Sequence, residues 1–377
     1  MTETPELTIY EKAFAKSDKT DAILLVDGKK MHVNKTLLSY HSDYFNTLFN
    51  SDFKEKSMKE IEIKDVNFEN FAIVLSLVHG APIKYKNEQK QVESLLEIAD
   101  RFQLSAAKRH IELFLITTTH SSSTLITIAD KFQLKELMDI TVSTYGKNDY
   151  ITGSWTVIGG RSTVVYEPKL DFFEKVTDET NNKLFHRWLE LNGRITQTPK
   201  TENPKISIYE STFAKSDKTD AILVVEGKKL HVNKTILSHH SDYFAALFHS
   251  DFKEKSMEEI EIKDVNFENF ASLLSLIHLN PIVPTVKNAV NILELSDRFI
   301  IPSVRYDLEP FIIASELTSL EKIRIGEKCE LSKLFQDGFN LLKADDFTDL
   351  PTNPTYQELS FATKRKLFEK SFKFFNR

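Results

Sequence analysis

Hydrophobic and polar positions near the start of the chain change period in an order that predicts a small sheet. Residues Ala22–Val26 form an apolar run, Asp27 and Gly28 make a typical two-residue hairpin turn, and Lys30–Val33 continues beyond it. The segment Glu60–Val66, with the sequence EIEIKDV, alternates apolar and polar residues as a half-buried strand does. We therefore expect a β-hairpin joined by a third strand.

The intervening and following segments have helical periodicity. Asn34 can cap a short helix over Lys35–Tyr40, because its side chain can accept from a free backbone N–H. The segment Val92–Leu104 places its apolar residues on one helical face, and Leu125–Leu134 repeats its pattern closely. These patterns predict an α+β domain, in which a small β-sheet is clasped by helical hairpins and is followed by a helical annex.

The chain contains this arrangement twice. Residues Phe14–His79 return as Phe213–His278, and 54 of the 66 aligned positions are identical. Similarity continues more weakly into Ile128–Met138 and its counterpart Ile325–Phe335. A repeat of this length indicates two tandem globular domains, because the repeats of solenoid proteins are only about 20 to 50 residues long.

The segment between the two copies has a weaker pattern. One helix is expected over Asn181–Leu191, and the polar stretch Asn192–Lys205 with its two prolines is typical of a linker. By residue number, we expect a first domain at 8–117, a helical extension at 118–145, a poorly defined segment with a linker at 146–205, a second domain at 206–315, and a helical extension at 316–377.

Composition narrows the class of protein. The formal net charge is −6, and there is no block of five or more like charges, which argues against nucleic acid and anionic membranes as partners. The single cysteine, Cys329, cannot form an internal disulfide bond. With no secretory signal pattern and no run of 18 apolar residues, we expect an intracellular protein, cytoplasmic or nuclear or both.

No motif for catalysis, for a metal or for a cofactor stands out. The histidines lack metal-ligand spacing, and the adjacent His239 and His240 point to different faces of a helix. Gly28 begins a turn with too few glycines to wrap a phosphate. We therefore expect no enzyme and no small-molecule substrate. An enzyme hidden in Gly146–Pro204 is the alternative of a different class.

The spacing of particular residues resembles the BTB/POZ domain family in both copies. The resemblance rests on the following residues and segments of the first copy: Asp21, Lys35, Leu38, Ser42, Phe45 and the helix LLEIADRF at Leu95–Phe102. The second copy offers Asp220, Lys234, Leu237, Ser241, Phe244 and ILELSDRF at Ile292–Phe299. The sequence departs from the family where Asn34 and Asn233 replace a histidine, which affects details of the family's charged dimer pocket.

The resemblance implies a non-enzymatic assembly module that dimerises through its first helix. It suggests ion pairs at a dimer interface between Asp21 and Lys35, and between Asp220 and Lys234. The alternative is that each aspartate binds strand-end amides while the lysine is solvated. Since two such similar copies should present nearly the same self-complementary surface, they could pair within one chain. A flexible segment of about 60 residues spans roughly 40 to 45 Å, enough to join neighbouring domains.

A subset of the family binds cullin-3 as an adaptor of a ubiquitin ligase, and the chain resembles this subset in two features. One is an apolar-x-Glu tripeptide, which Phe53 with Glu55 and Phe252 with Glu254 match. The other is a helical pair after the domain, called the 3-box, which Ser123–Val142 resembles well and Leu320–Leu341 less well. A phenylalanine there can anchor a partner groove or can instead hold the loop on its own domain.

Two functions therefore remain open from the sequence, a cullin-3 adaptor and an oligomerisation or transcriptional scaffold that does not bind a cullin. The protein that an adaptor would recruit is not indicated, because no segment resembles the MATH or kelch modules that often accompany BTB adaptors.

Overall fold

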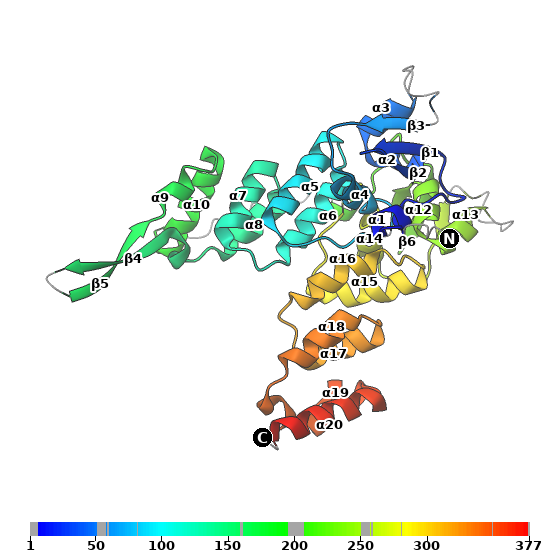
Figure 1. The fold of residues 1–377 in the computed structure, drawn as a ribbon. Coiled ribbons are helices and arrows are strands. Elements are labelled where there is room, and N and C mark those ends of the chain that lie inside the picture. Colours follow the sequence, from blue (N-terminus) through cyan, green and yellow to red (C-terminus); the bar gives the residue numbers. More distant parts are fainter. Residues whose placement is uncertain are drawn as a thin grey trace, which may run out of the picture.

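The computed structural model describes residues 7–50, 58, 60–80, 82–158, 161–194, 207–249, 257, 259–279, 281–348 and 350–375. Each copy folds into a three-stranded sheet with helices packed on it, and a helical arm extends from each copy (Figure 1). The two small sheets lie close together, and the arms diverge from them, one ending in β4, β5 and α10 and the other in α19 and α20. The fold is mixed α and β and mostly helical, as expected.

The first copy has the strand order β2-β1-β3, in which β1 pairs antiparallel with β2 and parallel with β3. Its elements are α1 (Ile9–Ala13), β1 (Ala22–Val26), β2 (Lys29–Val33), α2 (Lys35–His41), α3 (Asp43–Asn50), β3 (Glu60–Ile63), α4 (Phe68–Ser76), α5 (Gln89–Arg101) and α6 (Ser105–Ile116). Asp27 and Gly28 have φ angles of 47° and 75°, which confirms the expected type I′ turn, since that turn requires positive φ at both positions.

The second copy repeats this arrangement with the strand order β7-β6-β8. Its elements are α11 (Ile208–Thr212), β6 (Ala221–Val225), β7 (Lys228–Val232), α12 (Lys234–His240), α13 (Asp242–His249), β8 (Glu259–Glu261), α14 (Phe267–Ser275), α15 (Val286–Arg298) and α16 (Val304–Ile313). The pairing of β6 with its two neighbours matches that of β1, antiparallel to β7 and parallel to β8.

Stacked rings hold the interior of each copy together. Phe45 stacks on Phe102 with 5.8 Å between ring centroids, and Phe244 and Phe299 repeat the contact at 5.8 Å. All four rings are fully buried. The hydroxyl of Ser42 donates to the carbonyl of Phe102 at 2.6 Å, so the helix after the hairpin is tied to the end of α5. Because burial of such rings is worth several kcal/mol each, these contacts fix the helices on the sheet.

The arm of the first copy includes the segment that was expected to be poorly defined. It consists of α7 (Ser122–Phe132), α8 (Lys135–Thr144), the 3-10 turn η2 (Lys147–Tyr150), the hairpin β4 (Ile151–Ile158) and β5 (Arg161–Pro168), α9 (Leu170–Phe173) and α10 (Asp178–Leu191). Tyr150, Phe172, Val176 and Leu184 are buried and belong to the core of the first copy. The expected helix is therefore one part of a packed layer.

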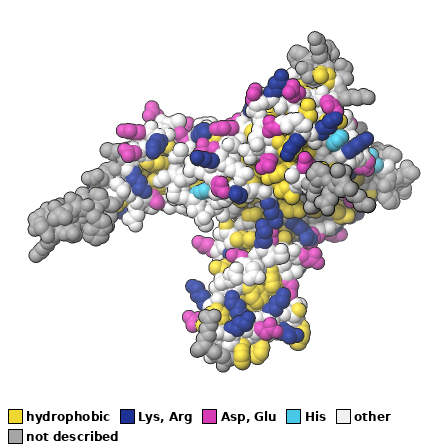
Figure 2. All heavy atoms as spheres, in the orientation of Figure 1, with side chains coloured by type: hydrophobic (Ala, Val, Ile, Leu, Met, Phe, Trp, Pro, Cys, Tyr) yellow, Lys and Arg dark blue, Asp and Glu magenta, His cyan; other side chains and the backbone are white. Residues whose placement is uncertain are grey.

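The second arm has a related plan without the hairpin. It consists of α17 (Ser319–Lys328), α18 (Ser332–Leu341), the 3-10 turns η4 (Ala344–Phe347) and η5 (Leu350–Thr352), α19 (Pro354–Glu358) and α20 (Phe361–Phe375). On the face shown in Figure 2, basic and acidic side chains are interspersed along both arms. No helix among the described residues is both long and apolar enough to cross a membrane.

Equivalent carboxylates show that the repeat continues into the last helix of each arm. Asp130 on α7 accepts hydrogen bonds from the hydroxyls of Thr177 and Thr180 at 2.6 and 2.5 Å, where α10 begins. Glu327 on α17 accepts from the backbone N–H and the hydroxyl of Ser360 at 3.0 and 2.5 Å, where α20 begins. Burial alone would raise the pKa of each carboxyl group, but these hydrogen bonds lower it. The same device therefore docks the outer helix in both arms.

Candidate protein-interaction site

The two copies pack against each other through equivalent elements. Helix α2 contacts α12, and α6 contacts α16. Leu37, Tyr40 and Ile236 form a small buried cluster across the contact, with Leu279 packed against it. Leu37 and Ile236 occupy the same position in the two repeats. We call this surface the repeat interface.

Reciprocal ring contacts show that the repeat interface has approximate two-fold symmetry. Tyr40 lies edge-on to His278, with 6.1 Å between ring centroids and an interplanar angle of 80°. The equivalent residues, His239 and His79, make the corresponding contact, with 6.0 Å between ring centroids and an interplanar angle of 81°. When residue i of one unit contacts residue j of the other, and the equivalent j contacts the equivalent i, the interface is isologous. The two copies therefore pair as the subunits of a dimer do.

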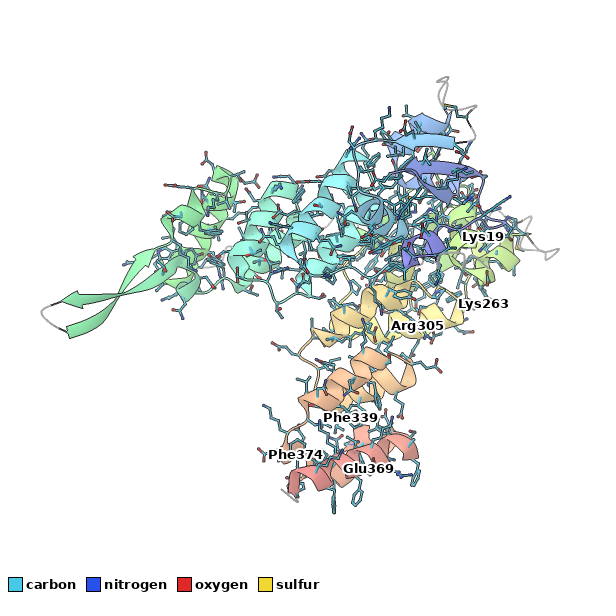
Figure 3. All side chains as sticks on the ribbon, in the orientation of Figure 1. Lys19, Lys263, Arg305, Phe339, Glu369 and Phe374 are labelled. Atoms are coloured by element: carbon cyan, nitrogen blue, oxygen red, sulfur yellow. The ribbon has the colours of Figure 1, made fainter. Side chains whose placement is uncertain are left out.

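Polar contacts cross the same surface. His110 Nδ1 lies 3.0 Å from Asp307 Oδ1, and these two residues are themselves equivalent, so they lie at the approximate two-fold axis. Lys218 Nζ donates to the carbonyl oxygen of Tyr40 at 3.3 Å and lies 3.4 Å from the carboxylate of Asp43. Burial and then the positive charge of its counterpart Lys19, which is labelled in Figure 3, lower the pKa of His239 in the second copy.

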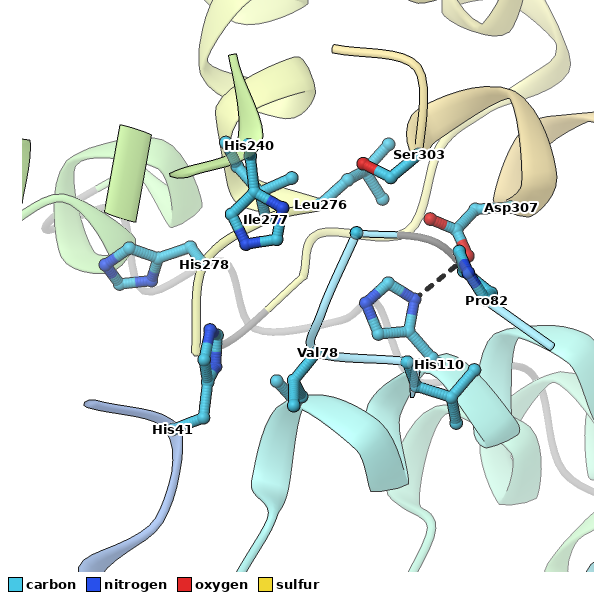
Figure 4. Close-up of a pocket in the computed structure, with 13 residues that line it drawn as sticks. His41, Val78, Pro82, His110, His240, Leu276, Ile277, His278, Ser303 and Asp307 are labelled. Carbon is cyan, nitrogen blue, oxygen red and sulfur yellow. Dashed lines mark hydrogen bonds and ion pairs between the residues drawn. The ribbon is translucent and has the colours of Figure 1, made fainter. Parts of the chain in front are cut away.

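Six histidines gather at the repeat interface, and six of their twelve ring nitrogens are buried without a hydrogen-bond partner in the described structure. Four of them, His41, His110, His240 and His278, line one small pocket (Figure 4). The other two are His79 and His239, whose rings contact each other, and His239 also contacts His240. Both ring nitrogens of His41 and of His240 are buried without a partner. The pocket that four of the histidines line has only about 10 Å³ of free space, too little to hold more than about one water molecule. A Cβ on Gly80 would lie 2.8 Å from His240, at a positive φ of 82°, so this position requires glycine.

Burial keeps most of these rings neutral. It lowers the pKa of His79 to about 3 and of His278 to about 4, and it takes the pKa of His41 and His240 well below the ordinary value. Burial also opposes the charge on His110, but the Asp307 carboxylate outweighs it and raises the pKa. The interface is therefore built for neutral histidines around one charge-assisted pair.

No group of three or more histidine, cysteine, aspartate or glutamate side chains is arranged to hold a metal ion in the part of the chain that the structure describes. Cys329, the one cysteine, is buried, and burial raises the pKa of its thiol. A buried thiol of raised pKa is a poor nucleophile.

The structure gives Asp21 and Lys35 a contact that differs from the expected ion pair. Asp21 Oδ1 accepts from the backbone N–H of Lys35 at 2.7 Å and so caps α2, while the Lys35 ammonium lies 5.7 Å from the centre of the Phe49 ring. Asp220 accepts from the backbone N–H of Lys234 in the same way, also at 2.7 Å. A role of these four residues between chains stays a prediction.

The four residues expected to bind a cullin, Phe53, Glu55, Phe252 and Glu254, lie outside the described residues. The sequence reasoning did not find Tyr40, Lys218 or the pair of His110 and Asp307. A signal was available for part of the cluster, because His41 and His79 recur as His240 and His278 in the second copy.

Comparison with known proteins agrees with this architecture. A family model described as the BTB/POZ domain matches residues 10–119 and 209–316, more than half of the chain. BTB and MATH domain-containing protein 36 of Caenorhabditis elegans is 30% identical over 219 residues, which cover 54% of the chain and 68% of that protein. BTB and MATH domain-containing protein 45 of the same organism is 23% identical over 327 residues, 86% of the chain and 60% of that protein.

Kelch repeat and BTB domain-containing protein 4 of Macaca fascicularis is also similar, at 26% identity over 136 residues. The match covers 36% of the chain but only 24% of that relative. The chain thus spans 68% of one of these relatives and smaller shares of the other two.

The histidine cluster predicts that acid weakens the folded chain. Because the pKa values of His41, His79, His240 and His278 are lowered, their stabilising contribution is fully present above the unfolded pKa of 6.5 and is lost as the pH falls below it. His110 acts in the opposite direction, because its pKa is raised. Below pH 6.5, each of the four histidines should lower the free energy of unfolding by about 1.4 kcal/mol for every unit by which the pH falls.

Urea denaturation between pH 7 and pH 5 measures this slope. The double variant His79→Phe with His278→Phe should flatten it by about half. His249→Gln, at an exposed position on α13, is the control and should leave the slope unchanged. A flat profile for the unaltered chain would contradict the interpretation.

Proposed function

The chain belongs to the BTB/POZ family, whose domains mediate protein–protein association and homodimerisation, and from this premise we propose that it is a self-paired adaptor of a cullin-3 ubiquitin ligase. In this proposal one chain supplies both halves of a BTB dimer, carries no catalytic group of its own, and brings a second protein to the ligase. The single observation that carries the proposal is the reciprocal packing of the two copies.

Pairing within the chain follows from the repeat interface. The reciprocal ring contacts and the His110–Asp307 pair already occupy the surface through which identical copies would meet. A covalent connection gives the two domains an effective concentration in the millimolar range, which favours this pairing over the pairing of separate chains. A scaffold that uses the domains only to join chains is the alternative, and it is weakened because the same surface is no longer free.

Cullin binding is supported by sequence and by the order of the elements. Phe53 with Glu55 and Phe252 with Glu254 match the apolar-x-Glu tripeptide of cullin-binding BTB proteins. Helix pairs α7–α8 and α17–α18 follow the two domains directly, in the position of a 3-box. Each phenylalanine would enter an apolar groove on a cullin helix, and each glutamate would pair at the rim. One chain would then offer two cullin-binding surfaces.

We expect the chain to be a monomer in solution. Light scattering coupled to size-exclusion chromatography, at micromolar concentration, should give the mass of one chain, 43.5 kDa. The physical reason is that the interface of a BTB dimer is already used inside the chain. A mass of two chains that persists on dilution would show that the domains pair between chains instead.

Cullin binding should depend on both tripeptides. Phe53→Ala or Phe252→Ala alone should reduce the number of cullin-3 N-terminal domains that bind with full affinity from two to one per chain, and the double variant should retain no surface of full affinity. Loss of a buried aromatic anchor costs about 2 kcal/mol, or roughly thirtyfold in affinity at that surface. Isothermal titration calorimetry gives both the stoichiometry and the affinity.

Matched controls are Phe185→Ala on α10 and Phe368→Ala on α20, which remove rings that are 60% and 69% exposed on the two arms. They should bind the cullin domain as the unaltered chain does. If the unaltered chain binds no cullin domain while remaining a monomer, the self-paired architecture stands and the adaptor function is wrong.

A further inference from the structure

The two edges of the repeat interface differ, although the repeats that form them are equivalent. At the first edge, Arg109 on α6 donates from Nε to the carbonyl oxygen of Pro281 at 3.0 Å. The same guanidinium forms ion pairs with Glu112 and with Glu136 on α8. Arg109 therefore joins α6, α8 and a loop of the second copy, and it fills this edge with a network of paired charges.

At the second edge, two of the three residues that would form this network are replaced, while Glu309 stands where the first repeat has Glu112. Tyr306 stands where the first repeat has Arg109, and Lys333 stands where it has Glu136. Lys84 lies beside Lys333, and its counterpart in the second repeat is Val283. The side chain of Tyr306 cannot form ion pairs with two carboxylates as that of Arg109 does. In addition, Lys333 places a positive charge where Glu136 places a carboxylate. The edge therefore stays open.

A groove of about 440 Å³ lies at this open edge, between α6 of the first copy and α16 of the second. Its apolar wall includes Tyr85 and Phe114, whose ring centroids are 4.9 Å apart, and Leu113, Pro310 and Ile313 complete it. Lys84 and Lys333 line the same groove and are exposed to solvent. We call it the edge groove. It exists only while the two copies are paired, since both contribute to its walls.

Neither lysine has an internal counter-ion among the described residues. In the described part of the chain, neither ammonium lies within ion-pair distance of a carboxylate. The nearby Glu309 accepts from the backbone N–H groups of Lys333 and Leu334 and so caps α18. The pKa of Lys333 is lowered, first by its contact with Lys84 and then by burial, and Glu309 offsets only part of this. An incoming carboxylate would relieve the repulsion.

We propose that the edge groove binds a short acidic peptide segment of a partner protein, with an apolar side chain against Phe114 and Tyr85 and a carboxylate between Lys84 and Lys333. This carboxylate would supply the negative charge that Glu136 supplies at the first edge. The identification of the partner as a recruited protein rests on the proposed adaptor function. Binding at the groove itself requires no cullin.

Two features favour a peptide over a small carboxylic acid. Lys84, Asn87, Thr119, Tyr306 and Lys333 are all exposed along the groove, so it would cover one side of an occupant, whereas small ligands are usually 70 to 90% buried. In addition, Pro310 within α16 has no N–H to donate to the carbonyl of Tyr306. That carbonyl therefore lacks its usual helical donor, at a residue that lines the groove.

Selection from a phage-displayed library of random heptapeptides, on the purified full chain without cullin, tests the proposal. We expect enrichment of peptides in which aspartate or glutamate adjoins leucine, isoleucine or phenylalanine. Fluorescence anisotropy with one enriched, labelled peptide then measures affinity. Lys84→Ala with Lys333→Ala should raise its Kd at least tenfold, because both charges that hold the carboxylate are removed.

A second double variant, Tyr306→Arg with Lys333→Glu, rebuilds at this edge the network that Arg109 and Glu136 form at the other. It should close the groove and abolish binding while retaining the melting temperature and monomeric mass of the unaltered chain. Lys287→Ala removes one exposed charge on α15 and is the control; it should leave the Kd unchanged.

Three results would overturn the proposal. These are a selection without acidic-apolar enrichment, full binding by the closed variant, and displacement of the peptide by 3-phenylpropionate at concentrations near the peptide's own Kd. The last result would identify a site for small carboxylic acids. Since cullin binding is measured separately, with the peptide absent, failure here leaves the adaptor proposal untouched, and failure of cullin binding leaves the groove untouched.

Discussion

The paired structure depends on the contact between His110 and Asp307, two equivalent residues that meet where the copies are related by approximate two-fold symmetry. In an isologous interface, a residue near the two-fold axis must face its own equivalent. Two buried aspartates at that point would repel each other, and two buried neutral histidines could form only an uncharged hydrogen bond. With histidine in one copy and aspartate in the other, the contact is a charge-assisted hydrogen bond. The surrounding helices α6 and α16 can therefore approach closely, and the edge groove forms beside them.

Much of the fold could be predicted from the sequence because its local signals are strong. The Asp27–Gly28 turn, the alternation in Glu60–Ile63 and the Asn34 cap of α2 all appear where expected, since each depends only on residues close together in the chain. The outer helices were harder to predict. Asp130 reaches Thr177 across 47 residues and Glu327 reaches Ser360 across 33, and no local pattern announces such contacts.

The candidate site was less predictable for a related reason. Sequence similarity to a family directs attention to positions that the family shares, such as Asp21 and Lys35, and here each aspartate caps a helix. The residues that distinguish this interface are those at which the two copies have diverged, including Tyr40 against His239 and Arg109 against Tyr306. Because the chain contains both repeats, these differences can be found by aligning one repeat with the other. The alignment does not show which of the diverged residues lie at the interface, and the three-dimensional structure does.

The hairpin formed by β4 and β5 has a consequence for evolution. In an assembly of two identical polypeptides, any insertion is necessarily present twice, once on each side. Fusion of the two units into one reading frame removes that obligation and fixes their ratio at one to one. One copy can then gain a structural feature such as this hairpin while the other copy keeps the simpler arm. Each half of the gene can therefore specialise without disturbing the association of the two copies.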